Sequence, residues 1–286
     1  MKKGFLSGAV LKNTAYITMF IDHFFAVVYL TLMRQYQAAG HEVGRMQQIY
    51  TVGRAVGRIS FILFTYLAVE GFLHTRSRKK YLLRLGIFAI VSEFPFDLAF
   101  SDTYYDPGSQ NVFFTLFLGI LALTIWEWTA EKVQRYMEMK ARCSPRQGIL
   151  WCVRVFTLAF CAGAAYLLYT DYKFMGVLLI FAFYQTRDRR LPVQMLAAGC
   201  VMLFGTWSMN CLRYAGSYSA EYLFRFSLRE MYGLFAFVWI GTYNGKKGHQ
   251  LPKAFYYCFY PVHLLLLHWA AGIAVSGMWS VVFLVR

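Results

Sequence analysis

The chain has 286 residues, of which 58% are hydrophobic and only 15% charged, and its formal net charge is +15. Average soluble proteins are about 45–50% apolar and about 25% charged, so this chain has too little polar surface to coat a soluble domain of its size. Its apolar residues form continuous runs of helix-spanning length, unlike the short alternating segments of a membrane β-barrel. The composition therefore predicts an all-α, polytopic integral membrane protein.

The excess of basic residues does not indicate nucleic-acid binding. Lys and Arg lie in short blocks between apolar runs, which is how membrane proteins encode their topology. The six cysteines show no CxxC or Cys/His ligand spacing, and most of them fall inside apolar runs. Free cysteine behaves there as a small hydrophobe, so we expect neither a disulfide framework nor a metal site.

The apolar runs predict about nine membrane-spanning helices, at residues 11–33, 57–73, 82–100, 112–129, 149–169, 174–186, 191–209, 228–243 and 254–274. The sixth run is short and the last apolar stretch continues to Val285, so eight to ten spans fit the pattern. A re-entrant segment near Gly272–Gly277 is one alternative for that last stretch. No linker or repeat divides the chain, which predicts a single helical bundle over residues 1–286.

Lys and Arg residues are distributed unequally between the two sets of loops, with seventeen on one side and eight on the other. The richer side holds the N-terminus and the loops 74–81, 130–148, 187–190 and 244–253. The positive-inside rule places this side in the cytoplasm, with the N-terminus inside and the C-terminus outside. We therefore expect a multi-pass protein of the cytoplasmic (inner) membrane, in contact with membrane lipids.

Two ionisable residues, Asp22 and His23, lie at the middle of the first predicted span. A charged side chain at this depth costs at least about 2.5–3.5 kcal/mol on insertion scales, so it is expected to face the protein interior and to serve a function. A carboxylate beside an imidazole can orient it and make it a competent general base. The alternative is a buried polar pair that fixes helix packing.

Two carboxylates, Glu93 and Asp97, share one face of the third predicted span because they are four residues apart. Pro95 lies between them and removes a backbone hydrogen-bond donor. Two buried carboxylates need a cation, a proton or a basic partner, for which Arg58 is a candidate. Structural and functional interpretations of this pair both stay open.

Further polar residues occur near the ends or the middle of other spans. Arg58 and Glu70 mark the outer and inner ends of the second span, and either can reach the headgroups or pair with a neighbouring helix. Arg58 is also a candidate clamp for an oxyanion. His263 lies near the middle of the ninth span, on the face that carries Tyr256 and Tyr260, and can line a polar cavity or be a satisfied core residue.

The loop HTRSRKKYLLR, residues 74–84, is densely basic. It is interpreted first as a topology signal that contacts anionic lipid headgroups. A second interpretation makes Arg76, Lys79 and Lys80 a phosphate clamp for a cytoplasmic cofactor such as coenzyme A. No P-loop, HExxH or GxSxG pattern is present, which argues against an ATPase, a zinc protease and an α/β-hydrolase.

Several segments, taken in order, resemble the TraX family. They are TMFIDHFFAV, GRISFILFTYLAVEGFLHTRSRKKYLLRL, VSEFPFDLAF, SQNVFFTL, DYKFMGVLLIFAFY and YNGKKG followed by FYYCFYPVHLLLL. The family is named for a conjugative-transfer membrane protein that N-acetylates pilin at its amino terminus. It is similar to a wider group of transmembrane acyltransferases that use cytoplasmic acetyl-CoA.

The resemblance implies membrane-embedded acyl transfer from acetyl-CoA, without a metal, to an amine or hydroxyl acceptor such as a protein amino terminus, a glycan or a small molecule. It matches family positions at Asp22, His23, Arg58, Glu70, Glu93, Pro95, Asp97 and Asn111. His23 would be the general base with Asp22 as its orienting partner, and Arg58 or Asn111 would stabilise the oxyanion. The alternative is a proton-coupled transporter or flippase that uses the buried carboxylates.

Overall fold

The computed structural model describes residues 4–139 and 146–284. Within this range the side chains of residues 133, 136–139, 146, 147, 253 and 277–284 are not described. All named elements of the described residues are helical, and their only extended pairings are two isolated bridges, between Leu6 and Tyr243 and between Gln110 and Thr170. The all-α class is confirmed.

The helices follow one another along the chain with short connections. They are α1 (Gly8–Phe24), the π-helix η1 (Phe25–Tyr29), α2 (Leu30–Ala38), α3 (Gly44–His74), α4 (Arg78–Ser101), α5 (Val112–Met139), α6 (Arg146–Leu167), α7 (Lys173–Thr186), α8 (Leu191–Arg213), α9 (Ala220–Ser227), the 3₁₀-helix η2 (Leu228–Ala236), α10 (Phe237–Gly241) and α11 (Lys253–Leu284).

Six of the described helical segments are long and apolar enough to cross a membrane: Gly8–Ala38, Gly44–His74, Val112–Lys132, Gly148–Leu167, Leu191–Arg213 and Ala254–Ser276. The predicted spans 82–100 and 174–186 are helical but do not meet this criterion. Helix α7 has only 14 residues, about 21 Å of rise, and most of its apolar side chains are buried inside the bundle.

The predicted span 228–243 does not meet this criterion either, because η2 and the five-residue α10 make up its residues 228–241. In contrast, α11 is one continuous helix through Gly272 and Gly277, so the alternative of a re-entrant segment there is not realised. Both α4 and α11 also continue through their internal prolines, Pro95 and Pro261.

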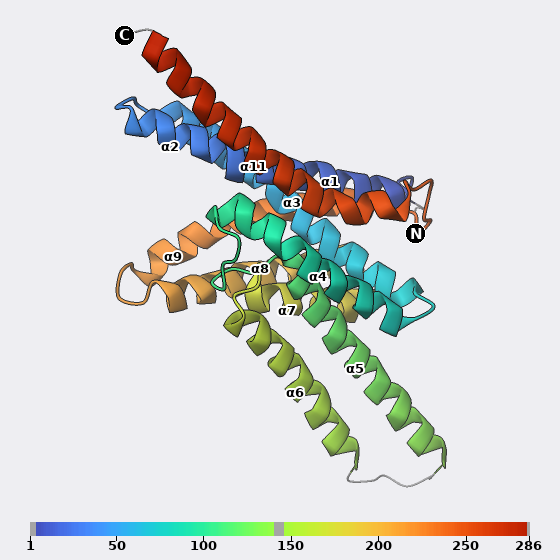
Figure 1. Cartoon of the computed structure of the whole chain (residues 1–286). Coiled ribbons are helices and arrows are strands. Elements are labelled where there is room, and N and C mark those ends of the chain that lie inside the picture. The colour runs from blue at the N-terminus through green and yellow to red at the C-terminus, as the bar shows by residue number, and fades with distance from the viewer. Residues whose placement is uncertain (1–3, 140–145, 285–286) are drawn as a thin grey trace.

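The loops lie at two ends of the molecule (Figure 1). At one end, the backbone N–H groups of Gly8 and Ala9 donate to the carbonyls of Lys246 and Lys247, which joins the start of α1 to the turn before α11. The connection 74–78 lies toward the same end, whereas the connections 38–44, 101–112 and 213–220 lie toward the opposite end (Figure 1). We call these the basic end and the opposite end. The N-terminal segment and the loop 74–78, both on the predicted Lys- and Arg-rich side, thus lie toward the same end.

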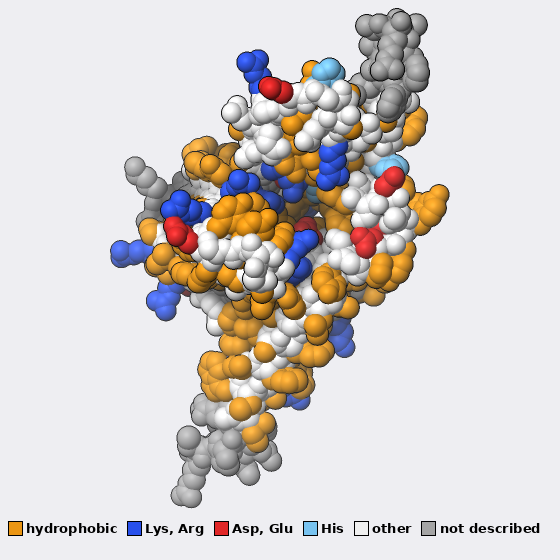
Figure 2. Space-filling view, turned by 90° about the vertical axis from the view of Figure 1, so that its left-hand side faces the viewer, with side chains coloured by type: hydrophobic (Ala, Val, Ile, Leu, Met, Phe, Trp, Pro, Cys, Tyr) orange, Lys and Arg blue, Asp and Glu red, His pale blue; other side chains and the backbone are white. Residues whose placement is uncertain are grey.

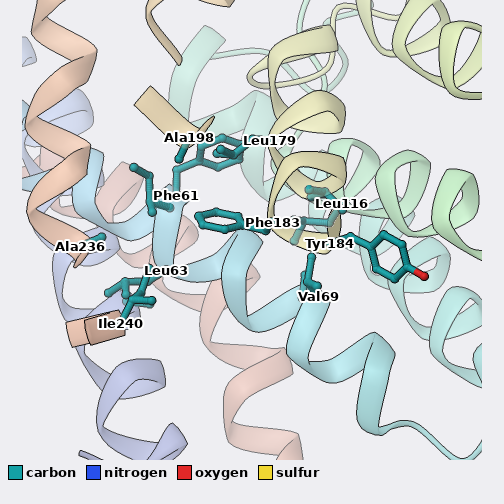
Figure 3. Close-up of a cluster of buried hydrophobic side chains, with 14 of the residues drawn as sticks. Phe61, Leu63, Val69, Leu116, Leu179, Phe183, Tyr184, Ala198, Ala236 and Ile240 are labelled. Atoms are coloured by element: carbon teal, nitrogen blue, oxygen red, sulfur yellow. The ribbon is translucent and has the colours of Figure 1, made fainter. Parts of the chain in front are cut away.

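Helix α3 runs through the centre of the bundle and carries much of the core. Phe61 and Leu63 of α3 pack with Leu179 and Phe183 of α7 and with Leu116 of α5 (Figure 3). All five side chains are buried. Association of helices in a membrane depends on close packing, so this contact fixes α3, α5 and α7 relative to one another.

Two glycines of α3 allow α1 and η1 to approach closely. A Cβ atom at Gly53 would collide with the ring of Phe25, and one at Gly57 would collide with the carboxylate of Asp22. The spacing of Gly53 and Gly57 is the small-xxx-small pattern that brings membrane helices together. This packing places the middle of α1 directly against the segment of α3 that carries Arg54 and Arg58.

Candidate active site

A pair of histidines joins the two ends of the sequence in the interior. His23 of α1 and His263 of α11 lie with Nδ1 and Nε2 2.7 Å apart, and the ring planes are within 5° of parallel. Nδ1 of His263 is also 2.7 Å from the carbonyl oxygen of Phe259. The rings of Phe100 and Tyr260 pack edge-on against His23. Both histidines are buried, so the pair is held rigidly between α1, α4 and α11.

Asp22 forms an ion pair with Arg54 instead of contacting His23. Its Oδ2 atom lies 2.7 Å from Nη1 of Arg54, and the same nitrogen donates at 3.3 Å to the backbone carbonyl of Asp22. Neighbouring residues on a helix point in directions about 100° apart, so the two side chains diverge. The expected contact between Asp22 and His23 is therefore not found, and the hydrogen-bond partner of the His23 ring is His263.

Arg58, one turn beyond Arg54 on α3, pairs with a different helix. Its Nε forms an ion pair with Oε1 of Glu230 in η2 at 3.0 Å, and its Nη1 donates a hydrogen bond at 3.4 Å to the hydroxyl of Tyr172. The predicted pairing of Arg58 with the carboxylates of α4 is therefore not found. A guanidinium has five N–H donors, and the hydrogen bond to Tyr172 uses one of them.

The connection between α6 and α7 inserts a strained segment beside Arg58. Tyr169, Tyr172 and Lys173 have φ values of 54°, 59° and 44°, in the left-handed region that non-glycine residues rarely adopt. Thr115 donates a short hydrogen bond to the backbone carbonyl of Asp171, which ties this segment to α5. Strained backbone of this kind persists where the surroundings fix it, often at functional sites.

Asp171 lies near the charged side chains of Arg58, Arg54 and Asp22. Burial raises the pKa of its carboxyl to about 6, and the nearby Arg58 and Arg54 lower it while Asp22 raises it. Burial disfavours the charged form of a carboxyl, which explains why the rise in pKa prevails over the attraction to two arginines. Asp22, Arg54, Arg58, Asp171 and Glu230 thus form one charge cluster around the middle of α3.

Two carboxylate oxygens of this charge cluster are buried without a hydrogen-bond partner among the described residues, namely Oδ1 of Asp22 and Oε2 of Glu230. Buried carboxylate oxygens normally accept hydrogen bonds, so both are able to accept one from a ligand. Figure 2 views the opposite end and shows a hollow with basic and acidic side chains gathered around it.

Glu93 and Asn111 have a structural role in the α4–α5 hairpin. The side-chain amide of Asn111 donates to the carbonyl of Ala89 at 2.7 Å and, in a short contact, to Glu93. Its Oδ1 accepts from the N–H of Phe113 at 3.0 Å, as a helix N-cap residue does. Both amide hydrogens of Asn111 are thus used within the fold. The amide of Asn111 thus has no free hydrogen for the predicted contact with an oxyanion, and its side-chain partner is Glu93.

Asp97 also supports a loop rather than facing Glu93 through a shared cation. It is 1% exposed, and it accepts a 3.0 Å hydrogen bond from the N–H of Asp106. Asp106 accepts in turn from the hydroxyl of Ser101 and the N–H of Gly108, which lowers the pKa of its carboxyl. No group of His, Cys, Asp and Glu able to hold a metal occurs among the described residues.

The remaining predicted site residues lie at the basic end. Glu70 accepts a 3.4 Å hydrogen bond from the hydroxyl of Tyr243. Arg76, Lys79 and Lys80 are exposed. Their neighbour Arg78 is used in ion pairs with Glu127 and Glu131 of α5. The structure therefore leaves the three predicted phosphate ligands accessible, at a distance from the histidine pair.

Helix α4 gives a measure of the distance between the predicted phosphate ligands and the histidine pair. Lys80 is near the first turn of this helix and Phe100, which contacts His23, is near the last. Twenty residues of α-helix rise by about 30 Å. An extended ligand bound by its phosphates at Lys80 would therefore have to reach most of the length of α4 to present a group to His23.

A groove of about 470 Å³ lies between α1 and α11. For a ligand that approaches His263 from the basic end, it is a shorter path than the length of α4. It is lined by one face of α1 and by the start of α11 with the turn before it, at Asn13, Tyr16, Ile17, Phe20, Ile21, Leu251, Phe255, Tyr256 and Phe259. The rings of Phe259 and Phe20, both in its lining, lie 4.8 Å and 6.2 Å from the ring of His263. The groove thus extends from Leu251, before α11, to side chains that pack on His263.

Sequence reasoning missed four residues of this site: Arg54, Asp171, Tyr172 and Glu230. Glu230 carried a signal, because it is a carboxylate inside the predicted span 228–243. Arg54 carried a weaker one, since it is four residues before Arg58 and so shares its helix face. Asp171 and Tyr172 lie in a connection outside every predicted span, and their one signal was that they begin the segment DYKFMGVLLIFAFY, which resembles the family.

The helices and their buried ionisable residues define a polytopic α-helical membrane protein with a polar interior site. The family described as TraX protein matches residues 7–270, and the chain therefore belongs to the TraX family, as its sequence motifs predicted. The chain is 29% identical over 237 residues to the probable fimbrial assembly protein FimC, serogroup H1, of Dichelobacter nodosus. That similarity covers 76% of this chain and 82% of the relative. No solved structure matches the chain.

Proposed function

We propose that the protein is a membrane-embedded acyltransferase that moves an acetyl group from cytoplasmic acetyl-CoA to an amine or hydroxyl acceptor at or across the membrane. The observation that carries the proposal is the buried His23–His263 pair, which keeps an imidazole away from bulk water and fixed in orientation. A general base must be positioned in this way, and an imidazole has the proton affinity for the task near neutral pH.

In the proposed reaction, His23 accepts the proton of the acceptor N–H or O–H as the acceptor atom attacks the thioester carbonyl. The C–S bond then breaks, and the leaving thiolate takes the proton back from His23. The developing oxyanion needs donors, and Arg58 has N–H groups that its contacts with Glu230 and Tyr172 do not use. Balanced in this way, the transfer needs no metal and no redox partner.

We propose a fimbrial or pilus subunit as the first acceptor to test. The relative from Dichelobacter nodosus is named as a probable fimbrial assembly protein, and the family resemblance implies acetylation of a pilin amino terminus. Asp22 Oδ1 and Glu230 Oε2, which lack partners among the described residues, are suited to accept hydrogen bonds from an incoming amine. Glycan and small-molecule acceptors are the other possibilities.

For the donor, we propose entry from the basic end with cations binding the phosphates. Arg76, Lys79 and Lys80 supply exposed charge there, but about 30 Å of α4 separates Lys80 from Phe100. Lys246 and Lys247 lie beside the start of α1, near the mouth of the α1–α11 groove. We expect the first set to attract the donor and the second to hold it.

Equilibrium binding of labelled acetyl-CoA to the purified protein tests this assignment. Neutralising Lys246 and Lys247 together should weaken binding at least tenfold, whereas neutralising Arg76, Lys79 and Lys80 should mainly reduce the dependence of binding on salt. Absence of any saturable acetyl-CoA binding by the wild-type protein would overturn the proposed function.

Transfer itself is measured as release of free CoA thiol when a peptide with a free amino terminus is added. The matched control is the same peptide with an acetylated terminus. Release with the free peptide alone supports amine transfer, and release with a simple alcohol supports a hydroxyl acceptor.

The proposed location is the cytoplasmic membrane with the basic end and the N-terminus inside. A Ser109→Cys variant in a background without the native cysteines should react with a membrane-impermeant thiol reagent added outside sealed cells. Labelling from the cytoplasmic side alone would contradict this topology.

The second candidate is a proton-coupled transporter or flippase, favoured by the buried carboxylate oxygens of Asp22, Glu93, Asp97 and Glu230 that lack hydrogen-bond partners among the described residues. Such a protein would show proton flux in sealed vesicles without acetyl-CoA. An acyltransferase would show thiol release that depends on acetyl-CoA and no such flux.

A further inference from the structure

We infer that His263 is a positioning residue that fixes the tautomer of His23, holding its proton on Nδ1 and leaving Nε2 as the basic atom. The catalytic consequence rests on the proposed function, but the tautomer itself does not. The inference follows from the direction of two successive hydrogen bonds.

The first hydrogen bond fixes the proton of His263. Its Nδ1 atom lies 2.7 Å from the carbonyl oxygen of Phe259, one turn earlier on α11. A carbonyl oxygen only accepts hydrogen bonds, so Nδ1 of His263 must carry a hydrogen. In a neutral imidazole the other nitrogen, Nε2, is then a bare acceptor.

The second hydrogen bond determines which ring nitrogen of His23 carries the hydrogen. Nδ1 of His23 is 2.7 Å from Nε2 of His263, a distance that requires one hydrogen between the two nitrogens. Because Nε2 of His263 is an acceptor, Nδ1 of His23 must be the donor. Nε2 of His23 therefore bears the lone pair, and His23 has no described hydrogen bond at that atom.

These positions of the hydrogens require both imidazoles to be neutral, and their surroundings favour the neutral state. His23 is 9% exposed and His263 is 3% exposed. No ion pair of either ring occurs among the described residues, since the adjacent carboxylate of Asp22 is bound to Arg54. Burial of a cation without a paired anion is unfavourable, so an imidazolium in the resting pair is disfavoured.

Aromatic packing holds the geometry in place. The ring of Phe259 lies on His263 at a centroid distance of 4.8 Å, and Tyr260 packs edge-on against both histidines. Rotation of either imidazole would break a hydrogen bond and disturb these contacts. When Nε2 of His23 takes a proton, its Nδ1–H keeps donating to His263, which plays the orienting part that a carboxylate plays in a Ser-His-Asp triad.

The test is ¹⁵N NMR of the histidine ring nitrogens in the purified full-length protein near neutral pH, with the His23 signals assigned by comparison with a His23→Ala variant. We expect a pyrrole-type signal for Nδ1 of His23 and a pyridine-type signal for its Nε2. The reverse assignment, or two protonated nitrogens, in the wild-type protein would overturn the inference.

Two substitutions separate positioning from packing. His263→Gln can keep an acceptor oxygen near the place of Nε2, and should preserve the tautomer of His23 and keep the rate of acetyl transfer within about tenfold. His263→Leu fills similar space without an acceptor, and should mix the two tautomers and lower kcat by roughly 10² with little change in KM. An unchanged His23 tautomer in the His263→Leu protein would refute the inference.

If the tautomer is as inferred but the wild-type protein neither binds acetyl-CoA nor releases thiol, the proposed function fails and the positioning of His23 stands. If acetyl transfer is observed with the opposite tautomer, the positioning role fails and the proposed function stands.

Discussion

Asp22 and Arg54 bind each other across the α1–α3 contact, with 2.7 Å between Oδ2 and Nη1 and with 13% and 25% of the two side chains exposed. Removing one partner of such a pair leaves the other charge buried and uncompensated. Arg54→Met should therefore lower the free energy of unfolding by about 3 kcal/mol.

The double variant Asp22→Asn, Arg54→Met tests this cause. Because neither charge is then left alone, it should be less destabilised than the sum of the two single variants, as measured by unfolding in detergent micelles. Strict additivity of the single effects would show that the ion pair makes no net contribution.

The close approach of α1 and α3 at Gly57 leads to a second prediction. A Cβ atom at this position would overlap the carboxylate of Asp22, whereas a Cβ atom at Gly163 of α6 would meet nothing within 4 Å among the described residues. Gly57→Ala should displace α1 and reduce the yield of folded protein, while Gly163→Ala should not. Equal yields of monodisperse protein by size-exclusion chromatography would contradict the α1–α3 packing.

The comparison of sequence and structure shows where helix patterns stop being informative. Apolar runs located nearly every helix, because hydropathy reports burial in lipid directly. They did not show that 228–243 is divided between η2 and α10, since a 3₁₀-helix and an α-helix can have the same hydropathy.

Partners of buried polar residues were harder to predict. Depth in a span correctly selected Asp22, His23 and His263 as interior residues, whereas Arg58, predicted at the outer end of its span, pairs with Glu230 of a neighbouring helix. Their partners depend on tertiary packing, and His23 and His263 are 240 residues apart in the chain. Adjacency in sequence suggested Asp22 for His23, but the rotation of a helix between neighbouring residues sends the two side chains to different helices.

Asp171 makes a prediction about pH. Burial raises the pKa of its carboxyl to about 6, so the folded protein holds this proton at pH values where the unfolded chain has lost it. The stability contributed by this group is therefore complete below pH ~4, declines as the pH rises through ~6, and changes little above that.

Asp171→Asn has no such titration. The thermal midpoints of both proteins are measured in detergent from pH 4 to 8. The midpoint of the variant should rise relative to that of the wild type as the pH rises, and the difference should level off above pH ~6. A difference between the two proteins that stays constant over this range would show that Asp171 ionises normally.

The central claim is that His23 acts as the general base of an acetyl transfer, and the most direct measurement is the single-turnover rate of acetyl transfer by His23→Ala. Acetyl-CoA binding by the variant, measured at equilibrium, serves as the control for folding. We predict a rate lowered by ~10²–10⁴ with donor binding unchanged, because only the proton acceptor is removed. A His23→Ala protein that binds acetyl-CoA and transfers the acetyl group at the wild-type rate would contradict the account.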